Sequence, residues 1–390
     1  MKIEQLKWDT ANDYDVFACN SGFSRADLVM VFGSRELLSN DEYVDSVRNK
    51  YPSAQVIGCT TSGEILGAQV FDNSFTTTAI EFDATRIESA CVGLKDPELS
   101  YEAGLELAKA LDKEDLAHIF VISEGLNVNG SRLVTGLKSG LTGNVSVTGG
   151  LAGDGILFNK TMTIANGHAK ENIVAAIGFY GDKIKIGFGS IGGWDSFGIE
   201  RLITKSKDNI LYEMDGKPVL DLYTDYLGEY AKDLPASGLL FPLSIRSKDS
   251  NEGLVRTILG VNMTDKSMTF AGDVPEGFYA KLMKANIDLL VNGAIESAEL
   301  SINNMDSPPS LAVLISCVGR KLIFNQRVEE EVEAVRDVLG EDCMLTGFYS
   351  YGEICPYTQI SNQNGIKVYK HIPGAELHNQ TMTITTFTEV

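Results

Sequence analysis

Carboxylates follow glycine-rich segments at three places in the sequence. Two of these segments read G-x-x-x-x-G-E-I, from Gly58 to Ile65 and from Gly347 to Ile354, and a looser copy runs from Gly149 to Asp154. Glu64, Asp154 and Glu353 therefore hold matching places in three similar segments. Because glycine permits tight turns and close backbone approach, each carboxylate is expected at a turn that a ligand can reach.

Arginines and tyrosines near these turns indicate what a site there would bind. Arg35 and Arg320 each stand three residues after an apolar run. Ligands of α/β proteins gather at the carboxyl ends of strands. A guanidinium with carboxylates suits a zwitterion, through charge-assisted hydrogen bonds. Tyr349 and Tyr351 would add aromatic walls with polar tips, and we expect Arg320 and Glu353 to share one cavity with one of them.

The same residues also have a purely structural interpretation. The three carboxylates would then accept hydrogen bonds from backbone N–H groups in their own turns, and each arginine would pair with one of them locally. Cys317 ends an apolar run, so its thiol is either a packed core group or a ligand and redox group. The two tyrosines fit a core as well as a site. The sequence leaves both interpretations open.

The elements that would position these residues recur three times. Continuous apolar runs predict strands buried on both faces, amphipathic periodicity predicts a helix that Gly340 ends, and threonine alternation predicts a third strand. The predicted fold is therefore mixed α/β (α+β), with three internal strand-helix-strand-turn-strand repeats forming mixed sheets. The first strands are 26–32, 117–123 and 311–317; the clearest helix is 326–339; the second strands are 54–57, 145–148 and 344–346; the threonine strings are 76–78, 161–163 and 381–383.

An inserted strand and helix segment, from about residue 180 to 305, separates the second repeat from the third. Gly216-Lys217-Pro218 begins a helix there, since proline is tolerated in the first turn. Phe278 to Val291 is also predicted as a helix. We expect a lead-in at 1–25, an N-terminal domain at 26–208 and a C-terminal domain at 209–390.

Composition excludes several classes of function. The 390 residues carry 33 basic and 53 acidic side chains, a net charge of −20, which disfavours binding to nucleic acid or anionic membrane. Six cysteines form no C-x-x-C pair, so zinc-ribbon and thioredoxin sites are excluded and free thiols in a reducing cytoplasm are expected. Phosphate-loop, H-E-x-x-H and G-x-S-x-G motifs are absent, so no enzyme class is indicated.

Several strings together resemble those of one family. They are 58–65, 148–154, 209–218, 270–277, 316–320, 347–354 and 377–383. On these residues the chain resembles the FIST family of sensory proteins, with an N-terminal and a C-terminal FIST domain. The resemblance implies a cytoplasmic sensor of a small molecule in signal transduction. It also implies a separate partner, such as a histidine kinase in a cyclic-di-GMP pathway, because the chain carries no output segment of its own.

The resemblance further implies haem and nitric-oxide sensing as the first ligand chemistry to test. An arginine with carboxylates suits haem propionates as it suits a zwitterion. Haem needs an axial ligand, and His378 is the candidate, although a satisfied structural histidine is the alternative. Three further functions stay open: an amino-acid-binding sensor, an uncharacterised enzyme and a scaffold. Ligand-binding residues are therefore predicted as Arg35, Glu64, Asp154, Cys317, Arg320, Tyr349, Tyr351 and Glu353.

Overall fold

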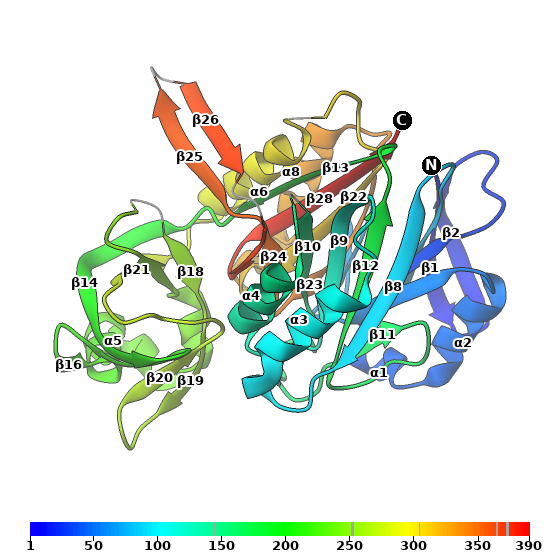
Figure 1. Cartoon of the computed structure of the whole chain (residues 1–390). Coiled ribbons are helices and arrows are strands. Elements are labelled where there is room, and N and C mark those ends of the chain that lie inside the picture. Colours follow the sequence, from blue (N-terminus) through cyan, green and yellow to red (C-terminus); the bar gives the residue numbers. More distant parts are fainter. Residues whose placement is uncertain (144, 251–252, 304, 364–365, 372–373) are drawn as a thin grey trace.

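Three six-stranded mixed sheets form the larger part of the molecule in a computed structural model (Figure 1). The structure describes residues 1–143, 145–250, 253–303, 305–363, 366–371 and 374–390. The first sheet runs β11 (Thr163–Ala165), β4 (Gln55–Thr60), β3 (Leu28–Gly33), β7 (Phe75–Glu81), β1 (Lys2–Thr10), β2 (Asp13–Cys19). The second runs β27 (Glu376–His378), β24 (Gly352–Cys355), β10 (Ser146–Leu151), β9 (Leu116–Ser123), β12 (Ile173–Tyr180), β8 (Arg86–Gly93). The third runs β13 (Ile184–Ile191), β28 (Met382–Glu389), β22 (Leu311–Cys317), β23 (Met344–Ser350), β5 (Glu64–Leu66), β6 (Gln69–Phe71).

The three sheets share a central arrangement. In each, a parallel pair of strands is joined through a helix, as the right-handed crossover of such pairs requires. An antiparallel strand flanks the first strand of each pair: β7 beside β3, β12 beside β9 and β28 beside β22. Fold class is therefore as predicted, with strands buried on both faces where the apolar runs are continuous.

One face of every sheet meets a common core. Phe32, Phe120 and Phe348 come from the three different sheets and belong to the same buried cluster. The rings of Phe32 and Phe348 lie 4.8 Å apart. Helices cover the other faces, and their apolar stripes supply separate clusters with each sheet. These helices are α1 (Arg35–Leu38), α2 (Asp41–Lys50), α3 (Ser100–Ala110), α4 (Gly130–Gly140), α6 (Ile287–Ile302), α7 (Val318–Phe324) and α8 (Glu329–Leu339), with 3₁₀ turns at Pro97–Leu99 and Asn325–Arg327.

Each of the three acidic turns, the glycine-rich segments that carry Glu64, Asp154 and Glu353, opens with a glycine that strand packing requires. A Cβ atom on Gly58, Gly149 or Gly347 would lie 2.0, 1.8 or 1.8 Å from a backbone carbonyl oxygen of the neighbouring first strand. The strand after each turn then crosses to another sheet: β5 pairs with β23, and β24 pairs with β10. The three acidic turns consequently come from different sheets and meet one another.

The predicted position of one strand is wrong. Thr161 and Thr163 were expected in the third strand of their own unit, as in the other two units. Instead β11 (Thr163–Ala165) pairs with β4 of the first sheet, and β12 takes the inner position. The reason is length, because β11 ends after three residues at Asn166, whose φ is +53°, whereas β12 supplies eight mostly buried residues.

A second, smaller body projects from the sheets (Figure 1). Its core is its own cluster of buried residues. The predicted helix from Phe278 to Val291 is wrong, because its first half is β21 and α6 begins only at Ile287. The sheet runs β18 (Leu254–Arg256), β17 (Leu243–Arg246), β21 (Tyr279–Lys284), β14 (Asp195–Lys207), β15 (Ile210–Met214), β20 (Ser267–Phe270), β19 (Ile258–Asn262), with β16 (Lys217–Pro218) on β15, α5 (Val219–Leu227) and 3₁₀ turns at Gly228–Asp233 and Ala236–Leu240.

The remaining elements lie at the periphery. A hairpin of β25 (Thr358–Gln363) and β26 (Ile366–His371) extends away from the sheets (Figure 1). The two chain ends are neighbours, since the amino group of Met1 lies 3.4 Å from the carboxylate of Glu389. The predicted boundary at residues 208 and 209 falls in the turn between β14 and β15, and this division stays a prediction. Among the described residues, no helix is long and apolar enough to span a bilayer.

Candidate functional site

A cavity of about 230 Å³ lies at the carboxyl ends of β3 and β4. Ser34 and Arg35 follow β3, the acidic turn follows β4, and the acidic turn of the second sheet forms the facing wall. The site therefore brings together segments more than 100 residues apart. The cavity is lined by Ser34, Arg35, Glu36, Thr61, Ser62, Gly63, Glu64, Asp72, Asn73, Asp154, Gly155, Ile156 and Leu157.

Arg35 is the cation in the cavity wall. Its Nη1 donates to Oδ2 of Asp154 over 3.2 Å, and its side chain is 23% exposed whereas that of Asp154 is 0% exposed. Among the described residues the guanidinium has no other hydrogen-bond acceptor. A guanidinium carries five N–H donors, so four remain for a ligand.

Asp154 is held from several sides. Its Oδ2 also accepts from the backbone N–H groups of Asn159 (3.1 Å) and Lys160 (2.9 Å), and its Oδ1 accepts from the hydroxyl of Tyr351. Asp154 thus fixes its own turn and orients Arg35. Of the site residues predicted from the sequence, Arg35, Asp154 and Tyr351 therefore lie together here. Some of the contacts among them stabilise the turn itself.

Glu64 has a comparable set of partners. Its Oε1 accepts from the hydroxyl of Thr61, and its Oε2 accepts from the backbone N–H (3.2 Å) and hydroxyl (2.6 Å) of Ser74. Burial raises the pKa of Glu64 to about 7, against the lowering effect of these hydrogen bonds and of Lys321. Burial therefore favours the protonated form of this carboxyl group, although Glu64 lines the cavity.

The cavity mouth combines charge with exposed apolar surface. Asp72 pairs with the ammonium group of Lys321, which also donates to the carbonyl oxygen of Ser62 over 2.8 Å. On the other side Ile156 and Leu157 are 65% and 59% exposed. Exposed apolar side chains beside a cavity are a common mark of interaction surfaces.

Glu353 lies away from this cavity and is completely buried. Its Oε1 accepts from the hydroxyl of Ser350 (2.7 Å), and its Oε2 accepts from the backbone N–H (3.1 Å) and hydroxyl (2.9 Å) of Thr381. These contacts match those of Glu64 group for group. Burial raises the pKa of Glu353 to about 8, more strongly than the hydrogen bonds lower it.

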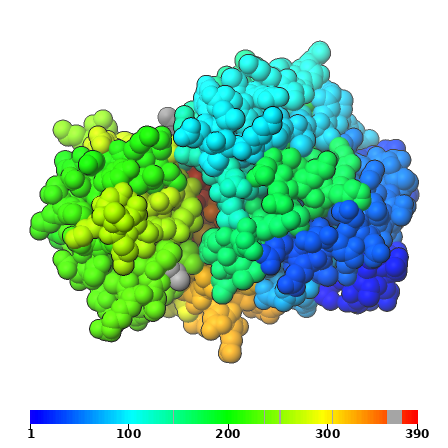
Figure 2. All heavy atoms as spheres, turned by 90° about the horizontal axis from the view of Figure 1, so that it is seen from below, coloured from blue at the N-terminus to red at the C-terminus, as the bar shows by residue number. Residues whose placement is uncertain are grey.

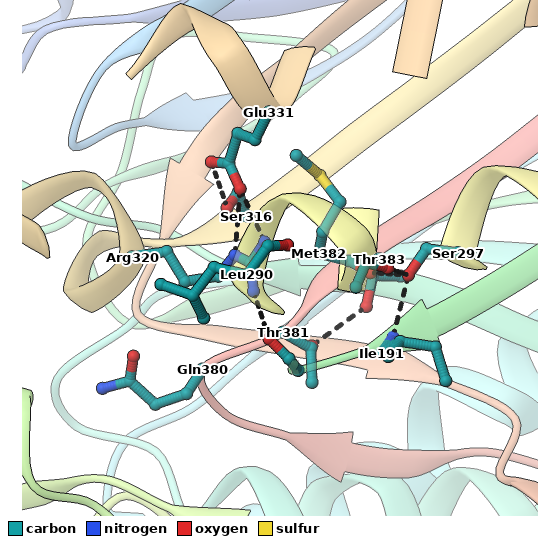
Figure 3. Close-up of polar contacts among 12 residues, drawn as sticks. Ile191, Leu290, Ser297, Ser316, Arg320, Glu331, Gln380, Thr381, Met382 and Thr383 are labelled. Carbon is teal, nitrogen blue, oxygen red and sulfur yellow. Dashed lines mark hydrogen bonds and ion pairs between the residues drawn. The ribbon is translucent and has the colours of Figure 1, made fainter. Parts of the chain in front are cut away.

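Arg320 was expected to share a cavity with Glu353, and the structure places it in the interior instead (Figure 3). Its Nε and Nη2 donate to Oε2 of Glu331 over 3.0 and 2.7 Å. Nη2 also donates to the carbonyl oxygen of Leu290 (2.9 Å), and Nη1 donates to that of Gly192. Both members of the Arg320–Glu331 pair are 0% exposed, so the pair connects α7, α8, α6 and the segment after β13.

Tyr349 and Cys317 belong to the same interior. The hydroxyl of Tyr349 donates to Oε1 of Glu331 over 2.8 Å, and burial raises the pKa of the phenol. Burial likewise raises the pKa of the Cys317 thiol, which opposes thiolate chemistry. A ligand role for Arg320, Tyr349, Glu353 and Cys317 stays a prediction that none of their contacts supports.

His378 does not fit an axial haem ligand in this structure. Its Nε2 lies 3.1 Å from the carbonyl oxygen of Cys355, and the ring is buried, which lowers its pKa to about 4. His118 is also engaged, with the hydroxyls of Ser146 and Thr148 at 2.7 and 2.9 Å from its two nitrogens. In the described part of the chain, no group of three or more His, Cys, Asp and Glu side chains is placed to hold a metal ion.

The sequence did not identify several lining residues. Glu36 and Asp72 supply carboxylates at the mouth, and Ser62 lies inside the acidic turn. A signal for Asp72 existed, because it precedes the Asn73 that opens the first threonine string. Nothing in the local sequence indicated that the Gly155–Leu157 segment would face Arg35.

Comparisons with known proteins bear on the whole chain. Residues 27–217 match the FIST N domain, and residues 220–356 match the FIST C domain. An uncharacterised protein of Methanocaldococcus jannaschii is 23% identical, and the match covers 88% of this chain and 72% of that protein. Cyanuric acid hydrolase from A. caulinodans aligns over 100% of this chain and 98% of its own at 9% identity, but a TM-score of 0.33 is too low to support an argument. On the two consecutive domain matches, the chain belongs to the FIST family.

Proposed function

We propose that this protein is a sensor that binds one small zwitterion, of the size of a free amino acid, in the Arg35 cavity. The observation that carries the proposal is the state of Arg35, which is oriented by Asp154 in a cavity wall and whose guanidinium has no second acceptor among the described residues. FIST domains generally serve as small-ligand sensor domains in signalling, which supports the same class of function.

Charge and size favour a zwitterion of this size. Arg35 would bind the ligand carboxylate, and the carboxylate of Glu36 would attract its ammonium group, whereas Asp72 is already paired with Lys321. A volume of about 230 Å³ is below the roughly 300 to 1,000 Å³ of sites for drug-sized ligands, so the cavity favours an amino acid over haem.

The signal would leave through the Gly155–Phe158 segment. This segment lines the cavity at Ile156 and Leu157, and Phe158 stacks on Tyr351 with ring centroids 4.5 Å apart. A ligand changes partner affinity only if it binds the free and complexed states differently, and a segment that is both cavity wall and surface can provide that difference. The partner is a separate protein with basic surface, such as a histidine kinase, because opposite charge speeds association with a chain of net charge −20.

Calorimetric titration with the twenty amino acids tests the proposal. We expect binding by the wild-type protein and at least tenfold weaker binding by Arg35→Gln, since a charged hydrogen bond contributes about 1.5 to 3 kcal/mol. Arg25→Gln is the matched control, because Arg25 is exposed and pairs with Asp27 outside the cavity. Equal affinity of the wild-type protein and Arg35→Gln would remove the cavity from the proposal.

Two further measurements separate the alternatives. An absorption spectrum of the purified protein, with and without added haem and nitric oxide, would replace the zwitterion with haem if a Soret band appears. Autophosphorylation of a candidate kinase, with and without ligand, tests signal output. Conversion of the bound amino acid into a product would replace the sensor with an enzyme.

A further inference from the structure

A second cavity, of about 420 Å³, lies between the sheets and the smaller body. Residues of α4 and the segment around Glu376 form one side, and β17, β18 and the loop before β21 form the other. Figure 2 shows the hollow between the body drawn in green to yellow and the rest of the chain. Interfaces between domains are frequent places for ligand sites.

Arg256 lies in the wall of this cavity and is only 4% exposed. Its Nε donates to the carbonyl oxygen of Asp273 over 3.0 Å, and its Nη1 donates to those of Val255 (3.3 Å) and Leu377 (3.1 Å). Within the described ranges, no carboxylate lies within 4.0 Å of this guanidinium and its Nη2 has no hydrogen-bond partner. Arg256 is therefore a buried cation whose direct hydrogen-bond partners are neutral carbonyl groups, although the carboxylates of Asp273 and Glu376 lie near enough to stabilise its charge.

Two of the other charged groups around the cavity form ion pairs, and a third is held by a neutral group. Arg246 donates from Nε and Nη2 to the carboxylate of Glu200. Glu376 pairs with Lys138 over 2.9 Å, and the carboxylate of Asp273 accepts from the side-chain amide of Asn129 over 2.9 Å. The contrast with Arg246 is informative, because two arginines line one cavity and, among the described residues, only Arg246 forms a direct ion pair.

The carboxylates of Asp273 and Glu376 stabilise the charge of Arg256 without forming a direct ion pair, and they offset the cost of burial only in part. An anion in direct contact with the guanidinium would offset that cost further. Burial lowers the pKa of Arg256 to about 10, so the side chain still carries its charge at neutral pH. The lining also includes the apolar side chains of Leu254, Pro275 and Phe278, together with several serine and threonine residues.

We propose that this cavity binds an organic carboxylate with an apolar body, which places its carboxylate on Nη2 of Arg256 and its body against Leu254, Pro275 and Phe278. Arg256 already donates to Leu377 across the boundary between the two bodies, so the ligand would reinforce that connection. This site is separate from the Arg35 cavity and does not depend on the function proposed for it.

Titration of the full-length protein with phenylacetate and with its neutral analogue phenylacetamide tests the site directly. We expect phenylacetate to bind at least tenfold more tightly, because only the carboxylate can pair with a buried guanidinium. Equal binding of the two compounds would overturn the proposal. Absence of binding by both compounds at about 10 mM would also overturn it, because a dissociation constant above about 10⁻² M is too weak for a useful site.

Variants assign the effect to Arg256 and control for folding. Arg256→Gln is expected to lose at least tenfold in phenylacetate affinity, whereas Arg246→Gln and Arg35→Gln should stay within about threefold of the wild-type protein. Circular dichroism and thermal unfolding establish that each variant is folded. If Arg256→Gln fails to fold, the comparison of acid with amide is repeated in Arg35→Gln. A preference for the acid that is lost in Arg35→Gln would come from the Arg35 cavity and would overturn the proposal. If only Arg246→Gln lost phenylacetate affinity tenfold, the anion would bind Arg246 and not Arg256, and the proposal would be overturned.

Discussion

Arg35 and Arg320 follow the first strands of two sheets, β3 and β22, yet their environments differ completely. Among the described residues, the guanidinium of Arg35 makes one hydrogen bond, to Asp154, and it stays partly exposed in a cavity wall. Arg320 makes four, to Glu331 and two carbonyl oxygens, and is fully buried. The same local pattern of strand followed by arginine therefore yields a candidate ligand-binding group at Arg35 and a buried structural group at Arg320.

The difference arises from segments that are distant in the sequence. Gly192 and Leu290 stand 128 and 30 residues from Arg320, and they close over it as α6 packs against the third sheet. Arg35 faces the acidic turn of the second sheet across a cavity, which that turn approaches without filling the space. What covers a strand end, more than the residues that follow it, decides whether an arginine there can reach a ligand.

The largest expected effect is on the buried pair. Arg320→Met would leave the Glu331 carboxylate buried without its counter-charge, so we expect the free energy of unfolding to fall by about 3 to 5 kcal/mol. Chemical denaturation in urea measures this. The double variant Arg320→Met with Glu331→Leu should recover part of the loss, because an apolar pair avoids the unpaired charge. A stable Arg320→Met variant that lost ligand binding would reverse the comparison.

The next effect concerns the two buried glutamates. Burial raises the folded-state pKa of Glu64 to about 7 and of Glu353 to about 8, above the ordinary value of 4.5. A raised pKa means that the folded state binds the proton more tightly, so its contribution to stability is complete below pH 4.5 and is lost as pH rises through the folded pKa. The loss is at most about 1.4 kcal/mol per pH unit for each carboxyl group.

Glutamine variants isolate these contributions. Relative to the wild-type protein, Glu353→Gln should gain stability as pH rises from about 5 to 8, and Glu64→Gln should do so from about 5 to 7. Urea unfolding at five pH values gives the difference, in which the titration of the histidines cancels. A difference that is independent of pH would mean that both carboxyl groups are ionised in the folded state throughout this range.

The sequence predicted the strands well and the site only in part. The run 311–317 is β22 residue for residue, because a continuous apolar stretch fits one position in a covered sheet. The acidic turns were found through their glycines, which the strand contacts require at Gly58, Gly149 and Gly347. The separation of Arg35 from Arg320 was not predictable, since it depends on the packing of α6 and on Glu331, which the helix pattern showed only as a charged residue off the apolar stripe.

The smallest expected effect is the change in the free energy of unfolding caused by Arg35→Gln. Arg35→Gln removes a single partly exposed ion pair, and such pairs contribute about 0 to 1 kcal/mol to the free energy of unfolding. Asp154 keeps the hydroxyl of Tyr351 and two backbone N–H groups as donors, so its buried carboxylate is not left without partners. We therefore expect a loss below about 1 kcal/mol in urea unfolding, together with the loss of ligand affinity. If Arg35→Gln instead destabilised the fold as strongly as Arg320→Met, Arg35 would be a structural residue like Arg320. The cavity beside it would then have no cation available to a ligand.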